Sequence, residues 1–539
     1  MKKLFFIPLL LIICPLFGQD INQAEDLLYY KKYGSAENIL NQVVKNNPEN
    51  AEAWYLLSSL PEKNEPAPEI KTALQNAPDE IKDNPYYLIA IGKMLLDESN
   101  VLEAEKYFVQ ALEKTKYKKP HILLAVAKAK ISAENGDVHQ AIDLLNRAIK
   151  KDKHNAELYI ELGKAYRKLN NGTEAFKAFM QAIDIDKNYA EAYYLTGMIF
   201  RTQNNPDVYL EYFTKAIAAD PKYAPAYYQL YYHYYFRNVN TAKDYLEKYI
   251  ALSDHNIEND YDYTDILYLT KNYTQAIDLA KKLIETDKEK TPARIYKLIA
   301  YSYREKGDHA NAFDYILHYF KVAPDSILIA KDFILVADLY TEKQKTDSAI
   351  FFYKVATELE RDSSSLIKYY KTLADLTKQQ KDHSERAMWL GKYYKANNNS
   401  TNVDLFNWGL AWFQAGNYDK ADSVFAMYSE KYPQQVFGYY WRGRSNAAMD
   451  STMELGLAIP YYFKVVEIGE TDTTGNSKRQ LIEAYGYLAG YEANEKKNYT
   501  KAIEYFEKLI QLDPDNEQAK KYVQILKEAA TKETSNTDS

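Results

Sequence analysis

One segment with two glycines partly resembles a phosphate-binding loop. Residues 469–478 read GETDTTGNSK. A phosphate-binding loop has the spacing G-x-x-x-x-G-K, because its backbone N–H groups and the lysine together hold the phosphates. Here five residues separate Gly469 from Gly475, and Asn476 follows instead of lysine. We therefore interpret the segment as an insertion loop.

Residues that could act as nucleophiles or metal ligands also lack the required spacing. The GRS at residues 443–445 is missing the second glycine of G-x-S-x-G. None of the eight histidines belongs to an H-E-x-x-H pair or another tight ligand spacing. The densest carboxylate run contains Asp254, Glu258, Asp260, Asp262 and Asp265. A weak divalent-ion site in this run stays an alternative; otherwise we expect no catalytic residue, metal or cofactor.

The elements that must position any functional residue belong to an internal repeat. Residues 156–189 read AELYIELGKAYRKLNNGTEAFKAFMQAIDIDKNY, and residues 190–223 read AEAYYLTGMIFRTQNNPDVYLEYFTKAIAADPKY. Each copy has 34 residues, with Gly at place 8, Phe at place 24 and Ala-Ile at places 27 and 28. Such a period indicates a solenoid, in which one unit buries its apolar face only against the next.

The spacing within one copy predicts two helices. Places 4, 7, 8 and 11 share one helix face, and places 20, 24, 27 and 28 share another. Residues 170–172 (NNG) form the turn between them, and the Asp-Pro at 220–221 stops the second helix. We expect Gly163 to face Ala175, where the absence of side-chain volume lets the two backbones approach.

The glycine at place 8, the alanines at places 20 and 27 and the proline at place 32 resemble the signature of the tetratricopeptide repeat. Place 20 falls on Ala36, Ala104, Ala141, Ala175, Tyr209, Ala242, Ala276, Ala312, Ala349, Ala387, Ala421, Ala458 and Ala502. The resemblance covers nearly all of the chain after residue 18. It implies an all-α tetratricopeptide-type α-solenoid, a right-handed superhelix of about fourteen helical hairpins with a C-terminal capping helix.

The repeats divide the chain into segments. We predict a signal peptide at 1–18, an N-terminal array at 19–252 and a C-terminal array at 264–516. The polar, acidic and poorly periodic residues 253–263 are a candidate hinge. Residues 517–532 are predicted to form the capping helix, and residues 533–539 a disordered tail.

The N-terminus has the pattern of a secretory signal. Lys2 and Lys3 precede an apolar run from residue 4 to residue 17, and Gly18 offers a small residue for cleavage. The run is too short to span a bilayer well. The only cysteine is Cys14, and Ile13 before it is too large for a lipoprotein signal. We therefore expect a periplasmic or secreted protein without a lipid, free of disulfides once the signal is removed.

Composition excludes some partners and favours others. A net charge of −7 and a pI near 5.8 argue against general nucleic-acid binding. Tyrosine is abundant, with 52 residues in 539. No further apolar stretch is long enough for a transmembrane span. The expected partner is another protein or an extended peptide, not a nucleic acid.

The resemblance also implies where a ligand would lie. In this family, places 2, 5, 9, 12 and 13 of the first helices line a concave groove. The binding-groove residues chosen from these places are Lys164, Arg167, Tyr194, Arg201, Tyr228, Tyr232, Tyr261, Tyr301 and Arg304. Tyr and Arg are enriched at binding hot spots. Because tyrosine is common throughout the chain, about half of these side chains could instead pack between helices.

The leading interpretation is a non-catalytic, exported scaffold that holds a peptide segment or a partner protein in this groove. By analogy with other exported repeat proteins, it would act in cell-envelope assembly or secretion, as part of an outer-membrane-associated complex. The alternative is a carbohydrate or cell-wall binding protein in which tyrosine rings stack on sugars.

Overall fold

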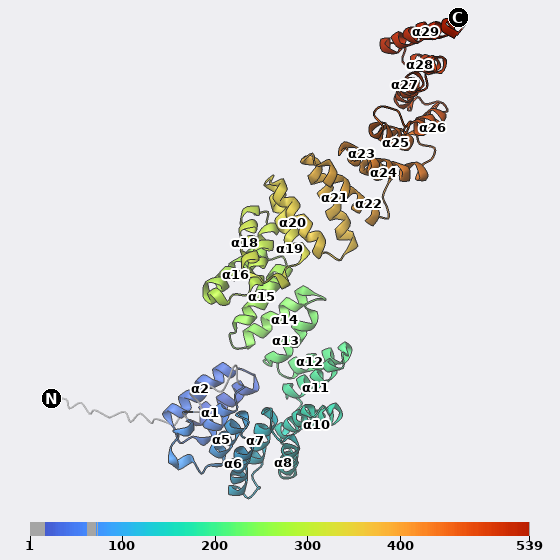
Figure 1. The fold of residues 1–539 in the computed structure, drawn as a ribbon. Helices are drawn as coiled ribbons and strands as arrows, with labels where there is room; N and C mark the ends of the chain where they lie inside the picture. The colour runs from blue at the N-terminus through green and yellow to red at the C-terminus, as the bar shows by residue number, and fades with distance from the viewer. Residues whose placement is uncertain (1–16, 62–71, 73, 538–539) are drawn as a thin grey trace, which may run out of the picture. The chain divides into compact units, whose positions relative to one another are not determined.

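The computed structural model describes residues 17–61, 72 and 74–537. All regular elements in this part of the chain are helices, and the chain forms two compact units, Met1–Lys306 and Gly307–Ser539. Within each unit, consecutive helices lie side by side as hairpins (Figure 1). Odd-numbered helices are the first helices of the hairpins, and even-numbered helices are the second. The predicted all-α hairpin architecture is therefore confirmed.

The N-terminal unit contains sixteen long helices in the described residues. They are α1 (Phe17–Tyr29), α2 (Tyr33–Asn46), α3 (Ala51–Ser58), α5 (Pro85–Asp97), α6 (Val101–Lys114), α7 (Pro120–Ser132), α8 (Val138–Lys151), α9 (Ala156–Lys168), α10 (Gly172–Ile185), α11 (Ala190–Thr202), α12 (Pro206–Ala219), α13 (Ala224–Tyr234), α14 (Val239–Leu252), α15 (Ile257–Leu269), α16 (Tyr273–Asp287) and α17 (Ala293–Glu305). Two short 3₁₀ helices are η1 (Asp79–Ile81) and η2 (Lys288–Lys290).

The C-terminal unit continues the hairpin pattern to the last helix. Its helices are α18 (His309–Val322), α19 (Ala330–Glu342), α20 (Thr346–Leu359), α21 (Ser363–Gln379), α22 (His383–Ala396), α23 (Asn402–Gln414), α24 (Tyr418–Lys431), α25 (Val436–Met449), α26 (Ile459–Gly469), α27 (Lys478–Asn494), α28 (Tyr499–Leu512) and α29 (Glu517–Thr537). The 3₁₀ helix η3 (Asp325–Ile327) precedes α19.

Asparagine pairs make the hairpin turns of the central repeats. Asn170 has a φ of 57°, a left-handed conformation that asparagine tolerates. The next residue, Asn171, caps α10, because its side chain accepts a hydrogen bond from the N–H of Glu174. Asn204 and Asn205 repeat this arrangement before α12. The turn predicted from the NNG at residues 170–172 therefore has a local chemical cause, and the NNP at residues 204–206 shares it.

The glycine at place 8 meets an aromatic ring. A Cβ atom added to Gly163 would lie 2.2 Å from Cε1 of Phe179, so the ring occupies the space that a side chain would need. The expected partner, Ala175, is not the residue that fills this space, and the structure corrects that expectation. The same pair recurs at Gly92 and Phe108, at Gly197 and Phe213, and at Gly409 and Phe425.

The boundaries differ from the predicted ones in two places. The candidate hinge at 253–263 is largely the start of α15, because the Asn256 side chain caps this helix and Glu258 and Asp260 favour its N-terminal turn. The compact units divide instead between Lys306 and Gly307. Helix α29 runs to Thr537, into the predicted tail, because no glycine or proline interrupts it.

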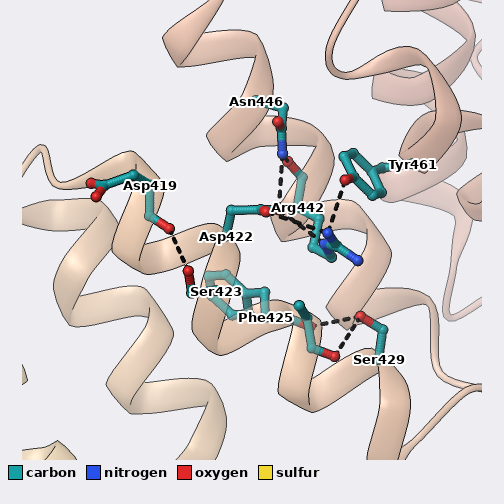
Figure 2. A network of polar contacts seen from close by, with 9 residues as sticks. Asp419, Asp422, Ser423, Phe425, Ser429, Arg442, Asn446 and Tyr461 are labelled. Atoms are coloured by element: carbon teal, nitrogen blue, oxygen red, sulfur yellow. Dashed lines mark hydrogen bonds and ion pairs between the residues drawn. The ribbon is translucent and has the colours of Figure 1, made fainter.

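A polar network joins three helices of the C-terminal unit, as Figure 2 shows. Arg442 of α25 donates to Asp422 of α24 at 2.9 and 3.3 Å, and to the Tyr461 hydroxyl of α26 at 2.8 Å. Asn446 also donates to Asp422, at 2.8 Å. Asp422 thus accepts hydrogen bonds from two side chains of the next repeat and couples neighbouring hairpins.

Replacing Asp422 with alanine is expected to destabilise α24–α26 by about 1 kcal/mol. The loss is larger than for a surface ion pair because the Arg442 and Asp422 side chains are mostly buried, and it stays modest because solvent still screens the pair. Amide hydrogen exchange should report faster exchange in these helices. Asp419→Ala is the control, because only the backbone carbonyl of Asp419 accepts a hydrogen bond, from Ser423. Equal exchange in both variants would contradict a coupling role for Asp422.

Candidate functional site

The first helices of the N-terminal unit surround a chamber of about 850 Å³. Helices α1, α3, α5, α7, α9 and α11 contribute to its wall. Its acidic lining residues are Glu25, Asp26, Asp97, Glu157, Glu161 and Glu191. Its basic lining residues are Lys31, Lys93, Lys128 and Lys164. The concave side expected from the repeat is therefore a charged cavity in this part of the chain.

Residues 29–35 comprise the end of α1, the turn after it and the start of α2, and they bond to residues much later in the sequence; we call them the clasp. The Tyr30 hydroxyl donates to Asp220 at 2.8 Å. Ser35 donates to Asp254 twice, through its N–H at 3.0 Å and its hydroxyl at 2.6 Å. These bonds connect residues 190 and 219 positions apart. Tyr29, Lys31 and Tyr33 of the clasp also line the chamber.

Aromatic contacts reinforce the clasp. The ring of Tyr29 lies 5.5 Å from the ring of Tyr189 and 5.5 Å from that of Tyr223. The N–H of Ala190 donates to the Tyr29 hydroxyl at 3.1 Å. Tyr223 is 0% exposed. The clasp is therefore packed into the array by buried aromatic surface as well as by polar bonds.

Glu191 is the central charge of the chamber wall. Its carboxylate pairs with Lys31 of the clasp at 2.8 Å and with Lys164 of α9 at 3.2 Å. Lys164 also pairs with Glu161 at 2.8 Å. Burial opposes both charges, but the ion pairs outweigh burial, so the pKa of Glu191 falls to about 2 and that of Lys164 rises. Lys164, predicted as a groove residue, therefore lies in the wall and is engaged by two carboxylates.

Two predicted tyrosines lie beside the clasp. Tyr194 and Tyr228 line a smaller pocket of about 140 Å³, whose wall also includes Tyr30 and Lys31. The Tyr228 ring lies 4.9 Å from that of Tyr249. Both predicted residues are half-buried. The chain's own N-terminal segment therefore narrows the groove at this point.

Beyond the clasp, aromatic side chains are exposed on the end of α13 and the turn that follows. Tyr232 is 55% exposed and Phe236 is 86% exposed, and the Tyr235 ring lies 4.7 Å from that of Phe236. We call these three residues the aromatic platform. The Arg201 guanidinium lies 4.8 Å from the centre of the Tyr232 ring and donates to Gln229. The structure thus brings the predicted residues Arg201 and Tyr232 together.

Tyr261 does not belong to this surface. Its side chain is 1% exposed, and its hydroxyl donates to Asp287 at 2.6 Å. Tyr261 is one of the predicted groove residues, but its ring is buried, so it does not share the exposed surface of Tyr232 and Phe236.

The remaining predicted residues lie on neighbouring first helices. Arg167 of α9 is half-buried, and burial lowers its pKa. Tyr301 of α17 is half-buried with the Lys297 ammonium 5.9 Å from its ring centre, and Arg304 is half-buried one turn further along. Their contact with a ligand stays a prediction.

Several wall residues were missed in the choice of groove residues. Glu157 and Glu191 stand at place 2 of their units, which is one of the groove places of the family. Their place in the repeat could have identified both as groove residues. Glu25 and Lys31 belong to the first hairpin, and no local pattern connects them to helices so far along the chain.

The acidic run at residues 254–265 is divided among different partners. Asp254 accepts from Ser35, and Asp260 lies 3.0 Å from His255. Burial raises the pKa of Asp265 to about 6, although Arg294 lies 3.4 Å away. In the described residues, no group of three or more His, Cys, Asp or Glu side chains could hold a metal ion. In the same residues, no helix combines the length and apolarity needed to cross a membrane.

Comparison with known families identifies the repeat in several parts of the chain. Family models described as tetratricopeptide repeat match residues 21–60, 132–199, 190–223, 405–434 and 487–516. The matches include both copies of the 34-residue repeat in the centre of the sequence. They lie in both compact units.

Solved structures that match parts of this chain include two that are described as tetratricopeptide or TPR repeat proteins. The C-terminal part of a TPR repeat-containing protein from Cytophaga hutchinsonii is 27% identical, with 49% of this chain and 99% of that chain covered and a TM-score of 0.30. MamA is 22% identical over 31% of this chain and 91% of that chain, with a TM-score of 0.25. A tetratricopeptide repeat protein from Parabacteroides merdae is 17% identical over 48% of this chain and 98% of that chain, with a TM-score of 0.28.

Proposed function

We propose that this chain, which is built of tetratricopeptide repeats, is an exported, non-catalytic scaffold that holds a partner protein on the first helices of its N-terminal unit. The repeat itself implies a role in protein binding. The finer parts of the proposal are the binding surface, the export and the place of action.

The aromatic platform carries the proposal. Tyr232 and Phe236 lie one helical turn apart and are both exposed, and neighbouring exposed apolar side chains of this kind are typical of interaction sites. Tyrosine with a neighbouring arginine is also the composition typical of binding hot spots. Arg201 is already held by Gln229 and the Tyr232 ring, so little side-chain freedom is lost when a partner binds.

The export part rests on the N-terminal signal pattern. Its apolar run falls mainly in residues 1–16, outside the described residues, and Cys14 lies there too. We propose cleavage after Gly18, release into the periplasm or the exterior, and a role in an outer-membrane-associated complex. Intact-mass measurement of protein from its native cell should give a chain that begins at Gln19 without a lipid.

Carbohydrate binding is the second candidate, because exposed tyrosine rings can stack on sugars. The position of Arg201 argues against Tyr232 as the main sugar platform, since the guanidinium covers one face of that ring. Phe236 remains available for stacking. Competition for the platform by peptides and by glycans separates the two candidates.

The platform is tested by crosslinking and by substitution. A photoreactive phenylalanine analogue at position 236 should crosslink one protein in envelope extracts, and Tyr232→Ala with Phe236→Ala should weaken binding of that purified partner by about 1–2 kcal/mol for each residue. The matched control is Leu102→Ala with Val109→Ala on the second helix α6, which removes exposed apolar side chains elsewhere. Unchanged affinity in a folded platform variant would move the binding surface away from α13.

A further inference from the structure

The smaller pocket beside the clasp is lined by four tyrosines, and we call it the tyrosine pocket. They are Tyr30 of the clasp, Tyr194 of α11, Tyr228 of α13 and Tyr249 of α14. The other lining residues are Lys31, Ala224, Pro225, Gln229 and Ser253. The three residues of the aromatic platform are not among them, so the inference below does not depend on the proposed function.

The volume of the tyrosine pocket, about 140 Å³, suits a small chemical group. At about 30 Å³ for each water-sized group, the pocket has room for four or five of them. A trimethylammonium group with its next methylene consists of one nitrogen and four carbon atoms, so it matches this space. Pockets for whole drug-sized molecules are larger, at roughly 300–1,000 Å³.

The tyrosine rings provide walls that a cation can contact. The rings of Tyr228 and Tyr249 lie 4.9 Å apart with an angle of 50° between their planes, so they form a corner and not a stack. Tyr30 is fixed, because its hydroxyl donates to Asp220 at 2.8 Å. All four tyrosines are half-buried. Aromatic rings attract cations, and a cage of such rings is the usual site for a quaternary ammonium group.

A carboxylate outside the lining acts on the corner between the two rings. Burial, followed by the negative charge of Asp262, raises the pKa of Tyr228, and Arg201 opposes this with a smaller effect. Burial raises the pKa of Tyr249 too, a hydrogen bond with Asn259 lowers it, and Asp262 again raises it. The corner therefore lies in the field of a carboxylate, which favours a cation there.

The positive charges near the pocket act elsewhere or are already paired. Burial raises the pKa of Tyr194, and the charges of Arg167 and Arg201 lower it. Lys31 lines the pocket, but its ammonium group binds Glu191 at 2.8 Å. A bound cation would therefore lie at the corner of the two rings and not against Tyr194.

One hydroxyl group in the lining has no hydrogen-bond partner. The Oγ atom of Ser253 is buried, and no residue that the structure describes bonds to it. Ser253 itself is held in place, since its N–H donates to the carbonyl of Tyr249 at 2.9 Å. A buried hydroxyl without a partner costs free energy, which an oxygen atom of a ligand would offset. The pocket thus offers a hydrogen-bond donor close to the aromatic corner.

The lining favours a quaternary ammonium group over a primary one. A primary ammonium group has three N–H donors, each of which needs an acceptor when it leaves water. Among the lining residues that the structure describes, none is an aspartate or a glutamate. A quaternary ammonium group has no N–H, so it can lie among tyrosine rings without losing hydrogen bonds.

We propose that the tyrosine pocket binds a trimethylammonium group between the rings of Tyr228 and Tyr249, with Ser253 donating to an oxygen atom of the same ligand. Choline carries this oxygen as a hydroxyl group, and glycine betaine carries it as a carboxylate. Tyr30 and Lys31 belong to the clasp and line the same pocket, so the ligand also stabilises the clasp against the array.

Titration calorimetry on the full chain tests the proposal with choline, glycine betaine, tetramethylammonium and 3,3-dimethylbutan-1-ol, which is the neutral isostere of choline. We expect one-to-one binding of choline or betaine, and binding of the neutral isostere that is weaker by about tenfold. Tyr228→Leu should lower the affinity about tenfold, because it removes a ring but keeps an apolar side chain. Tyr228→Phe keeps the ring and should retain most of the affinity.

Two further variants and a second measurement locate the site. Tyr522→Leu is the matched control, because it replaces an exposed tyrosine of α29 in the other compact unit. Ser253→Ala should weaken the binding of choline about fivefold, but it should not change the binding of tetramethylammonium, which has no oxygen. Amide hydrogen exchange of residues 29–35 should slow when choline is bound.

The outcomes identify the ligand or refute the site. A preference between choline and betaine shows which oxygen group the pocket accepts. No binding of either compound at millimolar concentration overturns the proposal. Equal binding of the neutral isostere refutes recognition of a cation, and an equal loss of affinity in Tyr228→Leu and Tyr522→Leu refutes the location.

Discussion

Replacing Glu191 with alanine is expected to lower the free energy of unfolding of the N-terminal unit by about 3–5 kcal/mol. The Glu191 side chain is 7% exposed and pairs with both Lys31 and Lys164. Its removal leaves two partly buried ammonium groups without this carboxylate, and breaking a buried ion pair from one side costs more than the pair contributes. The clasp should loosen at the same time, because Lys31 belongs to it.

The same carboxylate should make stability depend on pH. Burial alone would raise the pKa of Glu191, but Lys164 and Lys31 lower it from 4.5 to about 2. The unfolded chain has the ordinary, higher pKa, so it takes up the proton first as the pH falls. The contribution of Glu191, about 3 kcal/mol, is therefore fully present above pH 4.5 and disappears as the pH falls toward 2.

Urea unfolding at several pH values checks both expectations, and amide hydrogen exchange of residues 29–35 reports the state of the clasp. Asp184→Ala is the control, because Asp184 and Lys187 form an exposed pair with side chains 62% and 67% accessible. That change should cost less than about 1 kcal/mol. A Glu191→Ala protein as stable as the wild type at neutral pH would contradict a structural role for this carboxylate.

The second large effect is expected from Gly163→Ala, which should destabilise its hairpin by about 3 kcal/mol. The new methyl group would lie 2.2 Å from Phe179, far inside the ordinary carbon–carbon contact distance of about 3.5–4.0 Å. Phe179 is 0% exposed and cannot swing into solvent. Alanine favours a helix by about 0.5–1 kcal/mol over glycine, so the clash must outweigh that gain.

Gly172→Ala gives the matched comparison, because its Cβ atom would make an ordinary contact of 3.7 Å with Ile199. We expect no loss of stability in that variant. Repeats are coupled mainly to their neighbours, so hydrogen exchange in Gly163→Ala should increase in α9–α11 and much less in α15–α17. Destabilisation spread evenly over the N-terminal unit, or a larger effect at Gly172, would refute the packing explanation.

The repeat and its local chemistry could be predicted from the sequence. The 34-residue period, the asparagine turns and the spacing of apolar places act within one hairpin or between adjacent ones. These short-range patterns determine which residues become helical and which faces are buried. The small residue required at place 8 was also evident, although its partner proved to be Phe179 rather than Ala175.

The predicted groove residues also divide into those whose contacts follow from the repeat and those whose contacts depend on the tertiary structure. Arg201 and Tyr232 lie on consecutive first helices, so their contact follows from the repeat. Tyr261 occupies an equivalent family place, yet its ring turns inward because Asp287 accepts its hydroxyl. A place in the repeat indicates on which face of a helix a side chain lies. Whether that side chain is free to meet a ligand or packs against a neighbouring helix depends on the residues that surround it in the folded array.

The sequence by itself determined a helical repeat protein with a groove lined by tyrosine and charged residues. Only the tertiary structure decided that the clasp borders part of this groove, because the clasp reaches Glu191, Asp220 and Asp254 across 160 to 219 positions of chain. Such contacts arise from the curvature accumulated over many small rotations between hairpins. Short-range sequence patterns do not determine this accumulated rotation, so the pairing of Lys31 with Glu191 could not be predicted from the sequence.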